Sequence, residues 1–203
     1  MILRVHTTNP EPRIIGKAVE VLHTGGVIIY PTDTVYGLGC SIDNKSAIEK
    51  IHLIKQQRTD KPFSFVCSDL THISEYAHVS NTAFRIMKRL IPGPYTFILP
   101  AQRMKHLPRI LVSKRKTVGI RVPASPTTMA LVQALGNPIL STSVTSREGE
   151  VLHDPDEIAD QFRNRVEMIL DGGPLVSEQS TVVDLTGEEP EIVRLGSGSV
   201  DVL

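Results

Sequence analysis

The sequence predicts a single α/β domain that spans residues 1–203 and is built around a central mixed sheet. Three observations support this fold class. The length of 203 residues fits one large domain, at about 150 residues per domain, and 40% of the residues are hydrophobic, as in ordinary globular proteins. Short apolar runs alternate with segments of helical period. The sequence shows no repeat, low-complexity tract or linker-like stretch that would divide it.

The first third of the chain predicts two helices among three strands. Residues 1–6 predict a strand, and apolar residues at helical spacing over 14–22 predict a helix that ends at Gly25 and Gly26. The apolar run 27–30 predicts a buried strand. Asn44 is a helix-capping residue, and the apolar residues over 47–54 that follow it share one helical face. The predicted third strand is 63–67.

The same alternation continues to the C-terminus. Asn81 is predicted to cap a helix whose apolar face ends at Leu90. Asp154 and Pro155 predict the start of a helix that runs to about residue 163, because proline suits the first helical position. A further helix is predicted at 127–135, and strands are predicted at 95–99, 117–122, 138–142, 166–170, 181–185 and 192–193.

The net charge of zero hides a strong division along the chain. Residues 1–75 hold 8 acidic and 8 basic residues, residues 76–147 hold 11 Lys/Arg and no acid, and residues 148–203 hold 14 acids and 3 Lys/Arg. One interpretation is that folding pairs these charges on the surface. The other is a local positive field that attracts phosphates and nucleic acid. Because aromatic residues make up only 4% of the chain, we expect recognition of a backbone or duplex rather than base stacking.

Several classes of protein are disfavoured by the sequence. No apolar run approaches the roughly 20 residues of a membrane helix, and the N-terminus lacks the long apolar region of a signal peptide. Two cysteines without a Cys-x-x-Cys pair argue for a reducing, cytoplasmic location and against structural zinc. The seven histidines are scattered, so we expect no metal site. No phosphate-binding glycine loop, nucleophile elbow or zinc-protease motif occurs.

Four polar segments are candidates for a site. The stretch 31–39 follows a buried strand directly and is either an ordinary polar turn or a loop that approaches a ligand. Lys55, Arg58 and Lys61 either complement a helix dipole or clamp a phosphate, and the spacing alone favours the dipole. Thr117 and Arg121 share one strand face and can point into one cleft. The remaining candidates are the hydroxyl-rich stretch 141–146, Ser180 and Arg194, all of which also fit ordinary strand ends.

Taken in order, these segments resemble the YrdC/YciO family, which includes the threonylcarbamoyl-adenylate synthases of tRNA modification. The matching segments extend over nearly the whole chain and are 27–39, 55–62, 92–96, 117–123, 141–145, 180–185 and Arg194. The resemblance implies a twisted mixed sheet with flanking helices around a basic concave cleft, and it implies binding of double-stranded RNA or tRNA. In the synthases, L-threonine and bicarbonate form a carbamate that attacks the α-phosphate of ATP, with magnesium present. Such chemistry needs positioning and positive charge more than a protein nucleophile.

The resemblance also implies roles for individual residues. Thr34 and Arg121 would hold threonine with Thr32 nearby, because an arginine suits the carboxylate. Ser143 and Ser180 would lie on the threonine side as well. The residues implied to face the nucleotide are Lys55, Lys61, Thr117, Thr145 and Arg194, with Lys55 and Arg58 as the catalytic cations.

The chain departs from the synthases at three positions. Gln57 stands where they carry the arginine of Lys-x-Arg, although Arg58 is adjacent. Thr145 stands at the asparagine of Ser-x-Asn, and Lys61 replaces a second asparagine. A missing cation beside a phosphate-transfer transition state lowers the rate by orders of magnitude. These departures resemble the YciO branch of the family.

The sequence therefore predicts a protein that binds double-stranded RNA or tRNA and an ATP- or AMP-like nucleotide, and that is related to tRNA threonylcarbamoyladenosine modification. One alternative is an active L-threonylcarbamoyladenylate synthase, in which Arg58 or Lys61 replaces the lost arginine and ATP, magnesium, bicarbonate and L-threonine are used. The other alternative is a hydrolase that acts on a threonylcarbamoyl group. The departures favour the binding protein or the hydrolase over the synthase.

Overall fold

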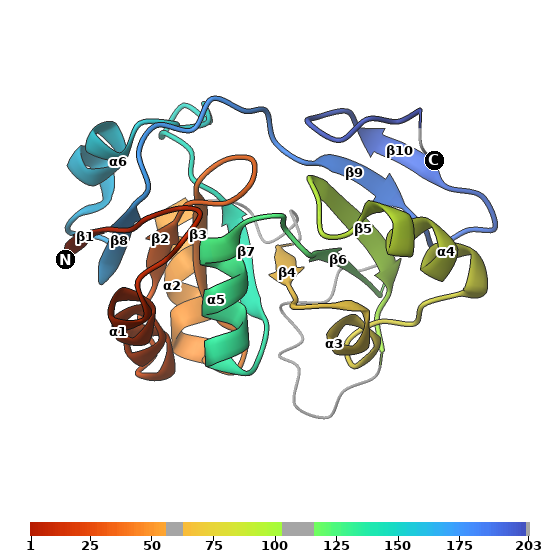
Figure 1. The fold of residues 1–203 in the computed structure, drawn as a ribbon, viewed down its shortest axis with the longest axis horizontal. Helices are drawn as coiled ribbons and strands as arrows, with labels where there is room; N and C mark the ends of the chain where they lie inside the picture. Colours follow the sequence, from red (N-terminus) through yellow and green to blue (C-terminus); the bar gives the residue numbers. More distant parts are fainter. Residues whose placement is uncertain (56–62, 103–115, 202–203) are drawn as a thin grey trace.

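The computed structural model describes residues 1–55, 63–102 and 116–201, and in these residues ten strands form one mixed sheet. The strand order is β1-β8-β2-β3-β7-β4-β6-β5-β9-β10 (Figure 1). Parallel pairs join β8 to β1 and β2, β4 to β6, and β5 to β9, and the other neighbours are antiparallel. The strands are β1 Ile2–Arg4, β2 Ile28–Tyr30, β3 Gly37–Ser41, β4 Ser64–Val66, β5 Tyr95–Pro100, β6 Thr117–Arg121, β7 Ile139–Ser143, β8 Met168–Asp171, β9 Thr181–Asp184 and β10 Glu191–Arg194.

Helices cover the two faces of the sheet unequally. On one face, α1 and α5 pack side by side over the strands of the N-terminal half, and their apolar residues share a core with Ile28 and Tyr30 of β2 (Figure 1). The larger core, which contains Phe65, Phe97 and Ile120, takes in the apolar residues of α2, α4 and α6. The helices are α1 Pro12–His23, α2 Lys45–Lys55, α3 Leu70–Ser74, α4 Asn81–Leu90, α5 Pro126–Leu135 and α6 Pro155–Phe162.

The alternation of side chains along the strands leaves part of one sheet face open. In β6, Val118 and Ile120 point into the larger core, whereas Thr117, Gly119 and Arg121 line a cleft. The same alternation holds in strands β4, β5 and β9. The cleft therefore lies on the face that α1 and α5 cover elsewhere.

Most predicted elements are confirmed within a few residues, and two were missed. Because the glycines of strand β3 have low strand propensity, the sequence predicts its first residues as part of the loop 31–39. A Cβ atom at Gly37 would come within 2.9 Å of Tyr30, so this strand needs glycine to fit between its neighbours. The short helix α3 is capped by Asp69 and was also not predicted.

The predicted cap of α4 was wrong by one residue. The hydroxyl of Ser80 accepts the backbone N–H of Ala83 at 3.1 Å, so Ser80 and not Asn81 is the N-cap. At the other predicted helix starts, Asn44 Oδ1 accepts the N–H of Ala47 at 3.0 Å, and Asp154 caps α6. Both serine and asparagine are favourable caps, so the sequence alone does not separate adjacent candidates.

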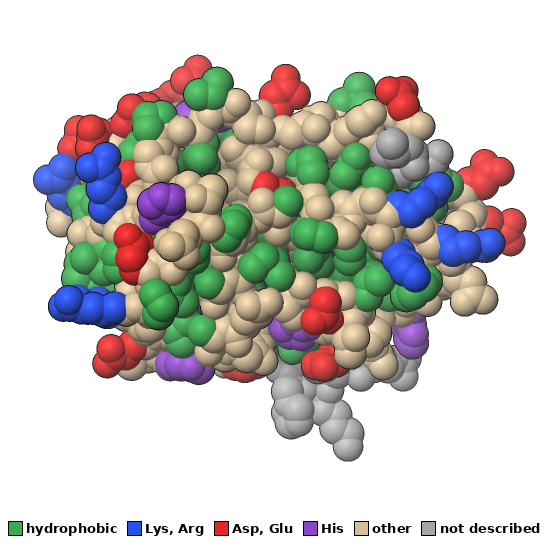
Figure 2. Space-filling model, in the orientation of Figure 1, with side chains coloured by type: hydrophobic (Ala, Val, Ile, Leu, Met, Phe, Trp, Pro, Cys, Tyr) green, Lys and Arg blue, Asp and Glu red, His purple; other side chains and the backbone are tan. Residues whose placement is uncertain are grey.

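The described charges of the two unbalanced stretches are arranged apart from one another. Within the described ranges, no ion pair joins a cation of 76–147 to an acid of 148–203. Lysine and arginine side chains gather at the two ends of the face in Figure 2, and its middle is mainly hydrophobic and uncharged. Arg85, Lys88 and Arg89 are exposed residues of α4. None of the described helices has the length and the apolar character that spanning a membrane requires.

Candidate functional site

A cleft of about 410 Å³ lies on the open part of the sheet. Its floor is formed by side chains of β4, β5, β6, β7 and β9, and its walls by the loop after β2, the end of α2 and the end of β10. Three cations, Lys55, Arg121 and Arg194, line it, and no described lining residue is acidic. The expected basic concave cleft is therefore present in the described part of the chain.

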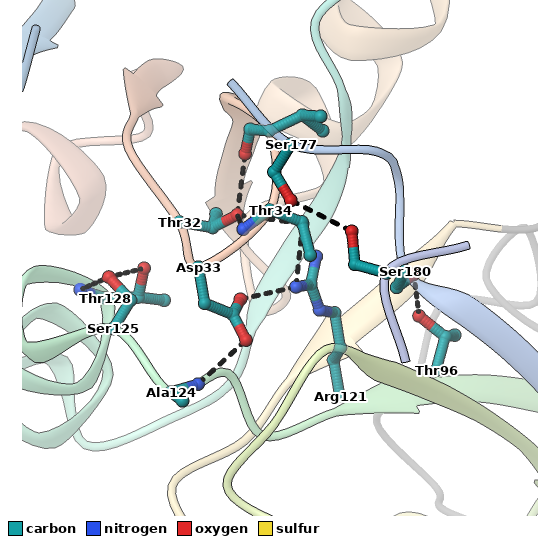
Figure 3. A network of polar contacts seen from close by, with 12 residues as sticks. Thr32, Asp33, Thr34, Thr96, Arg121, Ala124, Ser125, Thr128, Ser177 and Ser180 are labelled. Atoms are coloured by element: carbon teal, nitrogen blue, oxygen red, sulfur yellow. Dashed lines mark hydrogen bonds and ion pairs between the residues drawn. The ribbon is translucent and has the colours of Figure 1, made fainter. Parts of the chain in front are cut away.

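The loop between β2 and β3 forms one wall and is held by its own threonines. Thr32 donates its hydroxyl to the carbonyl of Val35 at 2.6 Å, and its Oγ1 accepts the N–H of Thr34 at 3.1 Å. The two threonine hydroxyls are 3.2 Å apart, and only 8% and 1% of Thr32 and Thr34 are exposed (Figure 3). Thr128 of α5 donates to the carbonyl of Pro31 at 3.0 Å. The loop is therefore a rigid wall and not a free turn.

Arg121 is fixed against this loop. Its Nη2 donates to Asp33 Oδ1 at 2.5 Å and to Thr34 Oγ1 at 2.9 Å (Figure 3). Asp33 Oδ2 accepts the N–H of Ala124 at 3.0 Å, so both carboxylate oxygens are engaged. The Nε of Arg121 is buried, and neither it nor Nη1 has a hydrogen-bond partner among the described residues. Burial lowers the pKa of Arg121, and the charge of Asp33 opposes that shift.

The C-terminal end of α2 brings a lysine to the opposite wall. Lys55 Nζ donates to the carbonyl of Ser143 at 3.0 Å and to Thr145 Oγ1 at 2.5 Å. Arg165 donates to the carbonyl of Ile54 at 2.6 Å and so holds the last turn of the helix. This arrangement places the ammonium group of Lys55 beside the end of β7.

The third cation comes from β10. Arg194 Nη2 donates to the carbonyl of Ser180 at 2.8 Å, and the hydroxyls of Ser180 and Thr96 are 2.7 Å apart. Burial lowers the pKa of Arg194, and the positive charge of Arg121 lowers it further. The two guanidinium groups therefore repel each other electrostatically, and both line the same cleft.

The structure brings together nine of the eleven residues that the sequence singled out. The residues that line the cleft are Thr32, Lys55, Thr117, Arg121, Ser143, Thr145, Ser180 and Arg194, and Thr34 contacts it through Arg121. Arg58 and Lys61 lie outside the described residues. The interpretation of Thr117 and Arg121 as residues of one strand face is confirmed.

Two further residues were not placed by the sequence. Asp33 lies in the segment 31–39, where the sequence does not decide its individual role, and its bonds to Arg121 and Ala124 make it a structural anchor. Gln179 was not considered, although it joins Ser143 to Arg194 in the cleft. Its position directly before Ser180 was the only available signal.

The described residues contain no group of three or more His, Cys, Asp or Glu side chains that could hold a metal ion. The carboxylate nearest the cations, Asp33, has both of its oxygens engaged by the protein. These residues do not fit a site in which the protein itself coordinates magnesium, because such sites use one or two free carboxylates together with substrate phosphates.

Comparisons with known proteins agree with this geometry. The family model Sua5/YciO/YrdC, described as "Telomere recombination", matches residues 20–196. An uncharacterized protein of Haemophilus influenzae is 48% identical over 198 residues, with 96% of this chain and 95% of the relative covered. The uncharacterized protein YciO of Escherichia coli K12 is 46% identical over 198 residues, with 97% and 95% covered.

Solved structures give the same result. The crystal structure of E. coli YciO matches with a TM-score of 0.93 and 45% identity, over 100% of this chain and 98% of that chain. The crystal structure of P. abyssi Sua5 complexed with L-threonine matches with a TM-score of 0.89 and 29% identity, over 97% of this chain and 57% of that chain. From its sequence, its fold and the composition of its cleft, the chain belongs to the Sua5/YciO/YrdC family.

Proposed function

We propose that this protein binds L-threonine, or the threonyl part of a threonylcarbamoyl group, together with an ATP- or AMP-like nucleotide. We further propose that it binds tRNA or double-stranded RNA in the context of threonylcarbamoyladenosine modification and makes little threonylcarbamoyl-adenylate. The observation that carries the proposal is Arg121, a largely buried guanidinium at the cleft wall whose Nη1 has no hydrogen-bond partner among the described residues.

The threonine end of the proposal rests on charge and hydroxyl groups. Because Nη1 of this guanidinium has no described partner, it can still donate to a carboxylate, the anion for which arginine is well suited. Thr32, Thr34 and Ser180 lie in the same part of the site and supply hydroxyls for a small polar amino acid. P. abyssi Sua5, whose structure matches this chain, was solved with L-threonine.

The nucleotide end rests on the other two cations. Lys55 and Arg194 line the cleft with Thr117, and no described lining residue contributes a negative charge that would repel a phosphate. A cleft that is partly lined by apolar side chains strengthens such charge interactions relative to water. Because the described residues offer no carboxylate set for a cation, we propose that magnesium, when ATP is used, arrives on the phosphates of the nucleotide.

The altered motif positions support weak adenylate synthesis. Thr145 accepts a hydrogen bond from Lys55 where the synthases carry asparagine, and Gln57 lacks the positive charge of their arginine. A cation that acts only on the transition state contributes several kcal/mol, about two to three orders of magnitude in rate. The exposed cations of α4 favour an RNA ligand, because phosphate contacts dominate such binding. The synthase and the hydrolase remain as alternative activities of the same cleft.

One set of measurements tests the proposal. The protein is titrated with L-threonine by calorimetry, then incubated with ATP, magnesium, bicarbonate and L-threonine beside an active Sua5 protein, and the adenylate is followed by mass spectrometry. We expect binding of L-threonine and far less product than the control makes. Product at the control's level that falls in Arg58→Ala would establish the synthase instead. Removal of the group from threonylcarbamoylated tRNA would establish the hydrolase, and no binding of L-threonine would overturn the proposal.

A further inference from the structure

A single glutamine side chain joins two walls of the cleft. Gln179 Nε2 donates to Ser143 Oγ at 2.8 Å, and Gln179 Oε1 accepts from Arg194 Nη1 at 3.0 Å. Ser143 ends β7 and Arg194 ends β10, and these strands are not neighbours in the sheet. All three residues line the cleft. The glutamine therefore sets the relative position of two groups that no strand pairing connects.

The orientation of this amide follows from chemistry. A guanidinium has donors only, so the oxygen of Gln179 must face Arg194 and its NH₂ group must face Ser143. The Ser143 hydroxyl is consequently an acceptor in that bond. Its own proton has no acceptor among the described residues, and the side chain lines the cleft. The hydroxyl is thus free to donate its proton to a ligand oxygen.

We propose that Gln179 is a positioning residue that fixes the Ser143 hydroxyl as a hydrogen-bond donor to an anionic oxygen of the ligand. We call the chain of hydrogen bonds from Arg194 through the Gln179 amide to Ser143 the relay. In it, Arg194 determines the orientation of the Gln179 amide, and the amide makes the Ser143 hydroxyl an acceptor. The identity of the ligand oxygen, a threonine carboxylate, rests on the proposed function. The orientation of the relay does not depend on it.

The first test needs no ligand. In a ¹⁵N NMR spectrum of the full-length protein, the side-chain NH₂ signals of Gln179 are assigned by their loss in Gln179→Met. We expect Ser143→Ala to shift these signals and leave those of the exposed Gln133 unchanged. Gln179 signals that are averaged by solvent and unaffected by Ser143→Ala would overturn the inference, whatever the protein binds.

The second test uses Gln179→Glu, which keeps the shape and the contact with Arg194 but can only accept from Ser143. The Ser143 proton then turns to the glutamate and its donation to the ligand is lost. Because the variant also adds a negative charge, it is measured in the native and the Ser143→Ala backgrounds, and Gln133→Glu on the exposed face of α5 is the charge control.

L-threonine affinity measured by calorimetry is the readout of this cycle. We expect Gln179→Glu to lower it about tenfold to a hundredfold in the native background and at most about threefold in Ser143→Ala. Equal losses in both backgrounds would mean charge repulsion alone and would overturn the inference. If the native protein does not bind L-threonine but the NMR shift is seen, the proposed function fails and the relay stands.

Discussion

The carboxylate of Asp33 and the guanidinium of Arg121 lie 2.5 Å apart, with 8% and 12% of their side chains exposed. The pair joins the loop after β2 to the end of β6, and the second Asp33 oxygen ties the loop to Ala124, just before α5. Arg121 would otherwise be a buried charge without a counter-charge, which is costly. The same contact therefore supports the fold and orients the guanidinium for a ligand.

Asp33→Asn is expected to lower the free energy of unfolding by about 3 kcal/mol, because it keeps the shape of the side chain but leaves the largely buried Arg121 charge unpaired. Urea unfolding measures the change. The matched control is Asp160→Asn, which breaks the exposed pair with Arg163 and should cost less than about 1 kcal/mol. Equal small losses in the two variants would show that the Asp33–Arg121 pair contributes little to stability.

The two ends of the cleft are expected to respond to different substitutions. Arg121→Lys should weaken L-threonine binding about tenfold to a hundredfold, because lysine cannot form the paired bonds of a guanidinium, and should change ATP binding little. Lys55→Gln should weaken ATP binding by a similar factor and leave L-threonine binding nearly unchanged. Calorimetry with each ligand measures both, with the exposed Arg163→Lys as control. Loss of both ligands in either variant would argue against two separate subsites.

His52 is expected to make stability depend on pH. Neither ring nitrogen has a hydrogen-bond partner among the described residues, and the ring packs edge-on against Phe63 at 4.6 Å. Burial lowers the pKa of His52 below its ordinary value of 6.5, so in acid the unfolded chain takes up this proton more readily than the folded one. The contribution of neutral His52 to the free energy of unfolding is therefore fully present above pH 6.5 and is lost as the pH falls below that value.

Urea unfolding from about pH 5 to pH 8 tests this sign. We expect His52→Leu to flatten the fall in stability at acidic pH, and the exposed control His78→Leu to leave it unchanged. An unchanged slope in His52→Leu would assign the acid sensitivity to another group.

Binding of double-stranded RNA is expected to depend on the outer surface of α4. Lys88 and Arg89 are exposed in its last turn, and the helix carries no acid. Replacing both by glutamine should weaken binding and reduce the slope of log affinity against log salt by about 2, because each phosphate contact releases roughly one counterion. The control replaces by glutamine two other exposed arginines, Arg4 at the end of β1 and Arg13 in the first turn of α1. Equal effects of the two double variants would indicate non-specific attraction.

Local features of the sequence predicted much of the fold. Helix α1 was predicted from the period of its apolar residues and from Gly25 just after its end, a residue that adopts a φ of +83° in the structure. The shared face of Thr117 and Arg121 followed from the two-residue repeat of a strand. Strand β3 was missed because Gly37 packs against Tyr30 of the neighbouring strand, a contact with no local signal.

The candidate site also combines features that local sequence predicts with contacts that only the folded chain creates. The sequence by itself determined most of the element types and which side chains of a strand share a face, because helical period, caps and side-chain alternation act over a few residues. Only the tertiary structure decided that Asp33 pairs with Arg121, 88 residues away, and that Gln179 bridges Ser143 and Arg194. These contacts depend on the order of strands in the sheet, and that order is set by packing between segments far apart in the chain.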